Sequence, residues 1–303
     1  MKPTLFVSAA ELSPVEVDRI VDIALAEDLA AGDVTTRSVI PPDALARGVI
    51  SAREPMVLAG LSVAARVFAR VDSRIVLTPT VADGSVLGRG AVVCEIVGPA
   101  HGVLTGERSA LNLLQRMCGV ATLTRRFVDA LPVGSGARIT DTRKTNPGMR
   151  ALDRYAVRAG GGHNHRNDLS SAVLIKDNHV AVCGGVRPAI ERARRAAPHT
   201  MRIECEVQSL AELDEALSAG VDVLMLDNFD DPQTIEALRR IRAISHPPIV
   251  EISGGITLGR VPTLAAMGLD VLSVGALTHG ARAVDIGLDL DVTGSWDGAT
   301  PLV

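Results

Sequence analysis

The sequence predicts an α/β protein whose C-terminal part is built from repeated strand–helix units. From Arg138 onward, short apolar runs alternate with amphipathic stretches of helical spacing, such as 210–219 and 232–243. The candidate strands are 138–140, 172–175, 202–206, 221–226, 248–252 and 270–274. Repeated βα units form a parallel sheet, and this many in succession favour a closed or nearly closed barrel. We count six strands and not eight, so a complete eight-stranded barrel does not follow.

The N-terminal part has a different pattern of predicted elements and is predicted to be a separate, smaller domain. Ser13 to Glu16 has the residues of a capping box with Pro14 in the first turn, which predicts the start of a helix. Between about 47 and 99 the chain has short β-like runs separated by turn residues. After Glu107 a helical segment links the domains, and the residues after about His279 are expected to pack back on the first domain.

Composition excludes several classes of protein. With one Trp and one Tyr, the chain has no aromatic platform on which nucleic-acid bases can stack. It has no apolar run long enough to span a bilayer and no leader at its N-terminus, so we expect a cytoplasmic protein without membrane contact. The four cysteines form no CxxC pair, which favours buried reduced thiols over a zinc or redox site.

Lysine usage points to an anion site. Only three of the 31 Lys+Arg residues are lysines, and Lys144 and Lys176 lie in dense polar clusters. These clusters are Asp141–Gly148, Gly160–Arg166 and Leu174–His179. They concentrate positive charge in a chain of net charge −4, which is typical of a local anion site and not of a nucleic-acid surface.

The ends of the predicted strands carry the candidate site, because barrel active sites gather at the carboxyl ends of strands. The residues that follow the strands are Thr142, Arg143, Lys144, Lys176, Glu206, Asp227, Ser253, Gly254, Gly255, Ser273, Val274 and Gly275. Each one is a weak signal, but charged or glycine-rich ends on almost every strand are a specific pattern.

The cations suit a small polyanion. Arg143 can grip a carboxylate or phosphate with two hydrogen bonds, whereas Lys144 and Lys176 act as point charges. His165 and Arg166 follow three glycines that permit close approach to a ligand. The alternative for every cation is ion pairing with acids of the barrel. We favour that alternative for the helically spaced Arg150, Arg154 and Arg158, and it stays open for His163.

The acids and the glycine turns complete the pattern. Glu206 and Asp227 end apolar strands, where they can accept hydrogen bonds from sugar hydroxyls, hold Mg²⁺ through water, or pair with the nearby lysines. Glu204 lies deeper on the same strand face and is the weaker candidate. The turns Ser253-Gly254-Gly255 and Gly275-Ala-Leu-Thr are suited to a phosphate.

These motifs resemble the quinolinate phosphoribosyltransferase family, also called nicotinate-nucleotide pyrophosphorylase (carboxylating). The resemblance covers nearly the whole chain, and its strongest elements are Glu107–Asn112, Thr142–Thr145 with Pro147-Gly148, the 160–166 loop and Ile175–His179. It implies an α/β sandwich domain over 1–115, joined by 279–303, and an incomplete α/β barrel over 116–278. It also implies a homodimer or larger assembly with shared active sites, in which Arg108 is presented to the partner subunit.

The resemblance implies a reaction and a set of roles. The family joins quinolinate to 5-phosphoribosyl 1-pyrophosphate (PRPP), giving nicotinate mononucleotide, pyrophosphate and CO2 with Mg²⁺, a step of de novo NAD biosynthesis. Carboxylate binding is then expected of Arg108, Arg143, His165 and Arg166, with Thr142 also at the substrate. Lys144 and Lys176 suit the pyrophosphate, Glu206 and Asp227 the ribose and metal, and both glycine turns the 5-phosphate. Departures at Asn146 and at Asn167-Asp168 put the loop conformation in doubt, but not the ligand groups.

Two rival functions are weaker. A molybdenum-transport-associated relative would be expected to have lost the Lys176-Asp-Asn-His179 motif, which is intact. A non-catalytic sensor of quinolinate or a sugar phosphate would be expected to lose Glu206 and Asp227, and both are present.

Overall fold

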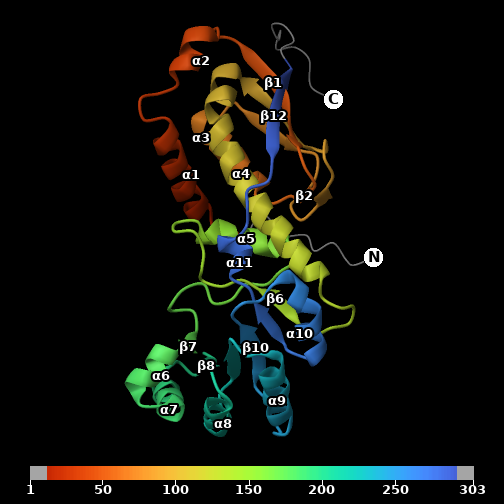
Figure 1. The fold of residues 1–303 in the computed structure, drawn as a ribbon. Coiled ribbons are helices and arrows are strands. Elements are labelled where there is room, and N and C mark those ends of the chain that lie inside the picture. Colours follow the sequence, from red (N-terminus) through yellow and green to blue (C-terminus); the bar gives the residue numbers. More distant parts are fainter. Residues whose placement is uncertain (1–11, 292–303) are drawn as a thin grey trace. The chain divides into compact units, whose positions relative to one another are not determined.

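The computed structural model describes residues 12–291 and divides them into two compact units (Figure 1). The first unit contains the residues up to 125, the segment 145–161 and the residues from 280 on, and the second contains 126–144 and 162–279. The elements of the first unit are α1 (Pro14–Asp28), α2 (Val34–Val39), β1 (Leu45–Ala52), β2 (Met56–Val57), α3 (Leu61–Val71), β3 (Val76–Pro79), β4 (Val86–Leu87), β5 (Val92–Pro99), α5 (Arg150–Ala159) and β12 (Ile286–Asp291). Helix α4 (Ala100–Asp129) begins in the first unit and ends in the second.

The first unit is built on a four-stranded antiparallel sheet in the order β12-β1-β5-β3. Ile50 in the middle of β1 pairs with Cys94 of β5 on one side and with Leu288 of β12 on the other. Helix α3 buries Val67 and Phe68, two residues of its apolar stripe. Alternation in the strands and a 3.6-residue period in the helices therefore give this unit its own core.

Two expectations for this unit have clear outcomes. Helix α1 begins at Pro14 as predicted, but the Ser13 side chain makes no capping hydrogen bond, so the capping box is absent. The backbone of Ser13 starts the helix instead, because its carbonyl accepts from the N–H of Val17 at 3.0 Å. At the end of the described chain, β12 pairs with β1 over 286–291, while 292–303 lies outside the described residues.

The boundaries differ from the predicted ones, which placed 116–278 in the barrel. The 115/116 boundary falls inside the unbroken helix α4, and residues 145–161 belong to the first unit. Long-range contacts explain the second difference. The Tyr155 hydroxyl donates to Asp83 Oδ2 at 2.7 Å, and Arg116 Nη2 lies 3.3 Å from Asp153 Oδ1. These contacts attach α5 to the first unit.

The second unit is a run of βα units. Its elements are β6 (Arg138–Thr140), β7 (Val173–Ile175), α6 (Asp177–Cys183), α7 (Val186–Ala196), β8 (Ile203–Val207), α8 (Leu210–Ser218), β9 (Val223–Asp227), α9 (Asp231–Arg242), β10 (Ile249–Ser253), η2 (Leu258–Arg260), α10 (Val261–Met267), β11 (Val271–Ser273) and α11 (Ala276–His279). All adjacent strands are parallel, in the order β6-β11-β10-β9-β8-β7.

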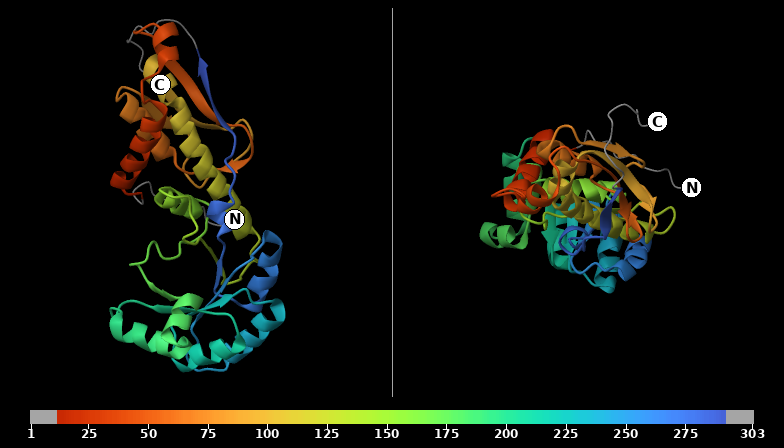
Figure 2. Two further views of the ribbon diagram at one scale, coloured as in Figure 1. Left: turned by 60° about the vertical axis from the view of Figure 1, so that its left-hand side comes forward. Right: turned by 90° about the horizontal axis from the view of Figure 1, so that it is seen from above.

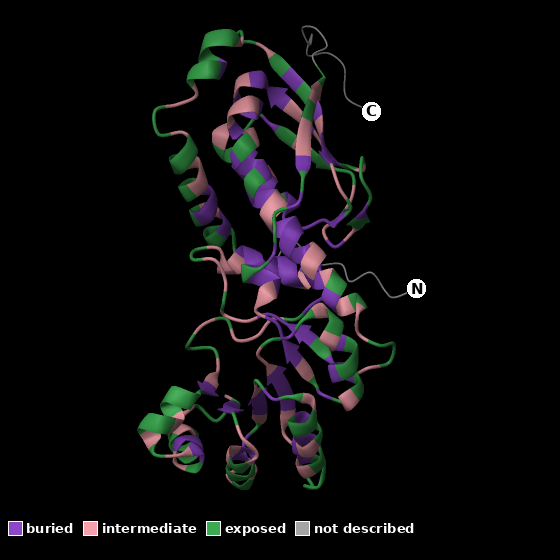
Figure 3. Cartoon of the chain, in the orientation of Figure 1, coloured by how far each residue is buried: buried purple, intermediate pink, exposed green. Residues whose placement is uncertain are grey.

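This strand order makes the barrel incomplete. Strands β6 and β7 follow one another in the chain but lie at opposite edges of the sheet, so the ring stays open between them. Helices α7, α8, α9 and α10 follow each other along the outside of the curved sheet (Figure 2). Buried residues concentrate on the strands and on the inward sides of these helices (Figure 3). Within residues 12–291, no helix is both long and apolar enough to cross a bilayer.

Candidate active site

The carboxyl edge of the parallel sheet brings the predicted strand-end residues together. The register sets Thr140 of β6 beside Ser273 of β11, Ser273 beside Ser253 of β10, and Ser253 beside Asp227 of β9. On the far side of β9, Glu206 lies one residue before the end of β8. One edge therefore carries hydroxyls and carboxylates from five strands.

Lys176 and Glu206 form a direct ion pair at this edge. Lys176 follows β7, and its Nζ lies 3.0 Å from Glu206 Oε2. The Lys176 side chain is 47% exposed and that of Glu206 only 7%. The alternative reading of Glu206, pairing with a nearby lysine, is thus observed. Because an ammonium has three N–H donors, the exposed part of Lys176 can still bind an anion.

The Thr142-Arg143-Lys144 segment is held at the end of β6. The Thr142 hydroxyl accepts from the Lys144 N–H at 3.1 Å, and the Thr278 hydroxyl donates to the Lys144 carbonyl at 2.9 Å. The Lys144 stem passes close to the turn after β11, since a Cβ on Gly275 would lie 3.1 Å from Lys144 Cδ. Lys144 and the Gly275 turn therefore share one location.

A buried carboxylate fixes the glycine-rich loop. Asp141, fully buried, accepts from Asn164 Nδ2 at 2.6 Å and from the backbone N–H of His165 at 2.7 Å. His163 pairs with Thr140, the last residue of β6, through an isolated parallel bridge. Burial, followed by the charge of Arg138, lowers the pKa of His163, so this ring is harder to protonate than a free imidazole. The loop conformation thus depends on Asp141.

His165 faces two buried acids. Its Nε2 lies 3.4 Å from Glu204 Oε2 and 3.5 Å from Glu251 Oε1, and its Nδ1 accepts from the backbone N–H of Arg166 at 2.8 Å. Burial disfavours the charged ring, and the two acids acting alone would outweigh it and raise the pKa of His165, but the hydrogen bond that Nδ1 accepts requires a lone pair there and leaves the ring proton on Nε2. Burial also raises the pKa of Glu204, and the charge of Glu251 adds to this rise. The cluster therefore holds its protons tightly.

The charges of Arg143 and Arg166 lie near enough to affect each other. Burial and then the charge of Arg143 lower the pKa of Arg166, which shows that the two cations repel each other. Arg166 Nη1 donates to the Ala172 carbonyl at 3.1 Å. The buried Nε of Arg143 has no hydrogen-bond partner among the described residues. Paired cations of this kind favour a bound anion with more than one charge.

The turn after β10 requires glycine. Gly254 has φ of +90°, and a Cβ there would lie 2.1 Å from Asn228 Oδ1 in the turn after β9. A cavity of about 530 Å³ opens at these turns, lined by Asn228, Phe229, Asp230, Asp231, Pro232, Gly254, Gly255 and Arg260. The backbone N–H of Val274, a residue predicted to bind substrate, already donates to the Thr140 carbonyl at 2.9 Å. It is therefore not available to a phosphate.

Several singled-out residues lie in the first unit. Arg108 is on α4, with a side chain that is 60% exposed. Arg150, Arg154 and Arg158 lie on α5, outside the barrel unit whose acids they were expected to pair with. Arg150 Nε donates to Thr145 Oγ1 at 3.2 Å, and the Arg158 guanidinium lies 5.8 Å from the centroid of the Tyr155 ring.

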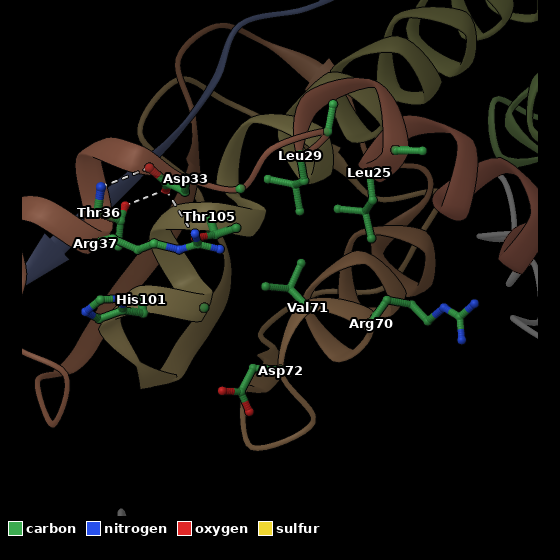
Figure 4. Close-up of a pocket in the computed structure, with 14 residues that line it drawn as sticks. Leu25, Leu29, Asp33, Thr36, Arg37, Arg70, Val71, Asp72, His101 and Thr105 are labelled. Atoms are coloured by element: carbon green, nitrogen blue, oxygen red, sulfur yellow. Dashed lines mark hydrogen bonds between the residues drawn. The ribbon is translucent and has the colours of Figure 1, made fainter.

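A larger cavity of about 790 Å³ lies wholly within the first unit and contains none of the predicted site residues (Figure 4). Asp33 on its wall is already engaged, because it accepts from the Thr36 N–H at 2.9 Å and from the Thr105 hydroxyl at 3.1 Å. The pKa of Asp33 is lowered, first by a hydrogen bond from the Thr36 hydroxyl and then by the one from the Thr36 N–H. The carboxylate thus caps α2.

Sequence reasoning missed three contributors to the site. Asp141 was seen only as part of a cluster, Glu204 was ranked as the deeper and weaker candidate, and Glu251 was not considered. The signal for Glu251 was a carboxylate in the middle of the apolar run 249–252, where only a hydrogen-bonded acid is tolerated.

An open parallel barrel with cations, carboxylates and glycine turns on one edge defines an enzyme of small anionic substrates. Comparison with known proteins identifies the family. The model of the quinolinate phosphoribosyl transferase C-terminal domain matches residues 120–289, and that of the N-terminal domain matches residues 33–118. The chain belongs to the quinolinate phosphoribosyl transferase family.

Individual relatives agree with this assignment. The chain is 46% identical over 272 residues to the nicotinate-nucleotide pyrophosphorylase [carboxylating] of Mycobacterium leprae, covering 88% of this chain and 94% of that one. It is 39% identical over 267 residues to a probable enzyme of that name from Bacillus subtilis, covering 88% and 91%. The crystal structure of NadC from Streptococcus pyogenes superposes with a TM-score of 0.87 at 39% identity, covering 92% and 98%.

Proposed function

We propose that the protein transfers the phosphoribosyl group of PRPP to quinolinate and releases pyrophosphate and CO2, forming nicotinate mononucleotide for de novo NAD biosynthesis. Family membership supports the reaction type. The observation that carries the proposal is the gathering of cations at the carboxyl edge of the barrel, where Lys144 lies beside the Gly275 turn and Lys176 pairs with Glu206. A substrate with two adjacent carboxylates suits the guanidinium groups of Arg143 and Arg166, because each can bind one carboxylate with two hydrogen bonds.

The lysines are proposed to bind the pyrophosphate. Lys144 is exposed beside the Gly275 turn, and Lys176 is half exposed beside Glu206. Breaking the bond between the ribose C1 and the pyrophosphate oxygen leaves negative charge on the leaving group. Ammonium groups stabilise this charge more in the transition state than in the ground state.

Glu206 and Asp227 are proposed to stabilise the ribose. As the leaving group departs, C1 gains positive charge, which nearby carboxylates stabilise electrostatically. Glu206 is buried, and its Oε2 is oriented by Lys176 at 3.0 Å. Asp227 ends β9, and its Oδ2 accepts from Asn228 Nδ2 at 2.9 Å. Both carboxylates can also accept from ribose hydroxyls.

The same two carboxylates fit Mg²⁺. They are oxygen donors on neighbouring strands, and Mg²⁺ in phosphate sites uses one or two carboxylates and keeps several waters. When bound with PRPP, the ion would neutralise charge on the pyrophosphate. The glycine turns at Ser253-Gly254-Gly255 and at Ser273-Val274-Gly275 are proposed for the 5-phosphate, with Gly254, Gly255 and Gly275 as the backbone donors.

Decarboxylation is proposed to follow the attack of the ring nitrogen on C1. The nitrogen then carries a positive charge, so the ring can accept the electron pair left when the C–CO2 bond breaks. A proton taken up at that carbon completes the mononucleotide. No residue of the site is required as a covalent nucleophile.

Assembly and location complete the proposal. We propose a cytoplasmic homodimer or larger homo-oligomer in which Arg108 of one subunit binds substrate in the site of its partner. The support is the exposure of the Arg108 side chain, 60%, on a segment, Glu107–Asn112, that resembles the family motif.

The test is a turnover assay with purified protein, quinolinate, PRPP and Mg²⁺, measuring CO2 and mononucleotide together. We expect equimolar CO2 and nicotinate mononucleotide, and no CO2 when nicotinate replaces quinolinate. Absence of turnover with quinolinate would contradict the proposal and favour the relative with another substrate or the non-catalytic sensor.

A further inference from the structure

A pair of buried acids lies beneath the proposed diacid site. Glu204 is on β8 and Glu251 on β10, and their side chains are 9% and 4% exposed. Alternate strands contribute to the same interior layer of a barrel, and such layers are usually filled by Val, Ile and Leu. Two acids in such a place cost stability unless a hydrogen-bond donor meets them.

The polar group nearest to both acids is the His165 ring. Its Nε2 is nearly equidistant from the two carboxylates, at 3.4 Å and 3.5 Å. Its Nδ1 accepts from the Arg166 N–H, which requires a lone pair on Nδ1 and therefore a proton on Nε2. The acids by themselves would favour a doubly protonated ring. The hydrogen bond at Nδ1 excludes that form, so the single ring proton lies on Nε2.

A metal ion is the competing interpretation. One ligand atom each from His165, Glu204 and Glu251 lies within 4.8 Å of the others, a spacing that can hold a cation. Histidine binds a metal through a ring lone pair, however, and here Nε2 is the nitrogen that keeps its proton. The geometry is therefore that of a donor between two acceptors.

Resting on the proposed function, we propose that Glu204 and Glu251 are positioning residues that act through His165 to orient Arg166 toward a carboxylate of quinolinate. The acids hold Nε2, the ring holds the Arg166 N–H through Nδ1, and the Ala172 carbonyl holds the guanidinium at 3.1 Å. A planar guanidinium binds a carboxylate with two parallel bonds only when it is correctly oriented. His165 is then a support for Arg166 and not itself a quinolinate ligand.

Two kinds of substitution at Glu204 and Glu251 separate the effect of side-chain reach from the effect of negative charge. Glu204→Asp and Glu251→Asp keep the charge but shorten the side chain, so they lose contact with Nε2. Glu204→Gln and Glu251→Gln keep the reach and lose the charge. The amide oxygen of each new glutamine can still accept from Nε2. Glu191→Gln, an exposed position on α7, is the control.

Steady-state kinetics of the full-length variants give the first test. Each Asp variant should raise the KM for quinolinate about tenfold or more, because one charge-assisted hydrogen bond is misaligned. The KM for PRPP should stay within about twofold, and each Gln variant should lie closer to wild type than the matching Asp variant. Equal losses for both substrates, or Gln variants worse than Asp variants, would overturn the proposal.

The second test measures which nitrogen of the His165 ring carries a proton. It requires neither enzymatic activity nor a folded variant of Glu204 or Glu251. In wild-type protein labelled with ¹⁵N-histidine, the resonance lost in His165→Gln should show a proton on Nε2 and should not respond to added Zn²⁺ or Mn²⁺. A bare Nε2, or a metal-dependent shift, would overturn the proposal. If wild-type protein shows no turnover, the proposed function is contradicted. The protonation of His165 can still be measured in that case.

Discussion

The Nζ of Lys176 lies 3.0 Å from Oε2 of Glu206, so a cation proposed for the pyrophosphate and a carboxylate proposed for the ribose are in direct contact. In the proposed reaction the C1–oxygen bond breaks between these two subsites. Opposite charges at that position stabilise both fragments as they separate.

Lys176→Met should separate the catalytic part of this ion pair from the structural part. We expect kcat/KM to fall by about 100-fold, the usual effect of removing a preorganised charge. The loss of stability should be about 1 kcal/mol or less, because the Lys176 side chain is nearly half exposed and solvent screens the pair. Arg187→Met on α7 is the control, an exposed cation whose removal should leave kcat/KM unchanged. A melt lowered by more than about 10 °C would indicate a mainly structural pair.

Arg143→Gln should reduce activity without reducing stability. The charges of Arg143 and Arg166 oppose each other, so removing one of them relieves repulsion in the free protein. We expect the melting temperature to stay level or rise, while the KM for quinolinate increases about tenfold or more. Thermal melts and initial rates on the same preparation check this. A clear fall in the melting temperature would show that Arg143 has a structural partner.

Gly254→Ala should disturb both the fold and the use of PRPP. The substitution places a Cβ 2.1 Å from Asn228 Oδ1 at a residue with φ of +90°. We expect a loss of about 1–3 kcal/mol, or roughly 3–8 °C in melting temperature, with a higher KM for PRPP. Gly136→Ala is the matched control, since a Cβ there meets nothing within 4 Å. Equal behaviour of the two variants would contradict the assigned role of the turn.

Mixed assemblies test whether active sites are shared. If Arg108 acts in the partner's site, an Arg108→Ala subunit paired with an Arg143→Ala subunit places both defects in one site of the heterodimer, and the other site remains intact. Co-expressed, differently tagged subunits should therefore regain part of the wild-type rate, although each variant alone is inactive. Verified heterodimers that show no rescue would rule out sharing through Arg108.

Local sequence pattern predicted the parallel sheet well because each strand is a short apolar run with a charge or glycine at its end. The strands predicted at 202–206 and 248–252 are observed at Ile203–Val207 and Ile249–Ser253, shifts of one residue. The strand-end rule brought Lys176 beside Glu206 for the same reason, since parallel strands end at one edge.

Features that depend on long-range packing could not be predicted from local sequence patterns. Helix α5 follows β6 in the chain, but the hydrogen bond from Tyr155 to Asp83 attaches it to the first unit. Periodicity also cannot show that Glu204 and Glu251, on alternate strands, meet at one imidazole. That meeting depends on the stagger of strands around a barrel and not on any local residue spacing.

The most direct test of the central claim, that cations at the carboxyl edge bind an aromatic diacid, is calorimetric titration with quinolinate, nicotinate and phthalate. The measurement is made with and without Mg²⁺ and pyrophosphate. Quinolinate and phthalate should bind with similar affinity, and nicotinate should bind about tenfold more weakly or worse, because one carboxylate is missing. Nicotinate binding as tightly as quinolinate, or quinolinate binding unchanged in Arg143→Gln, would contradict the account.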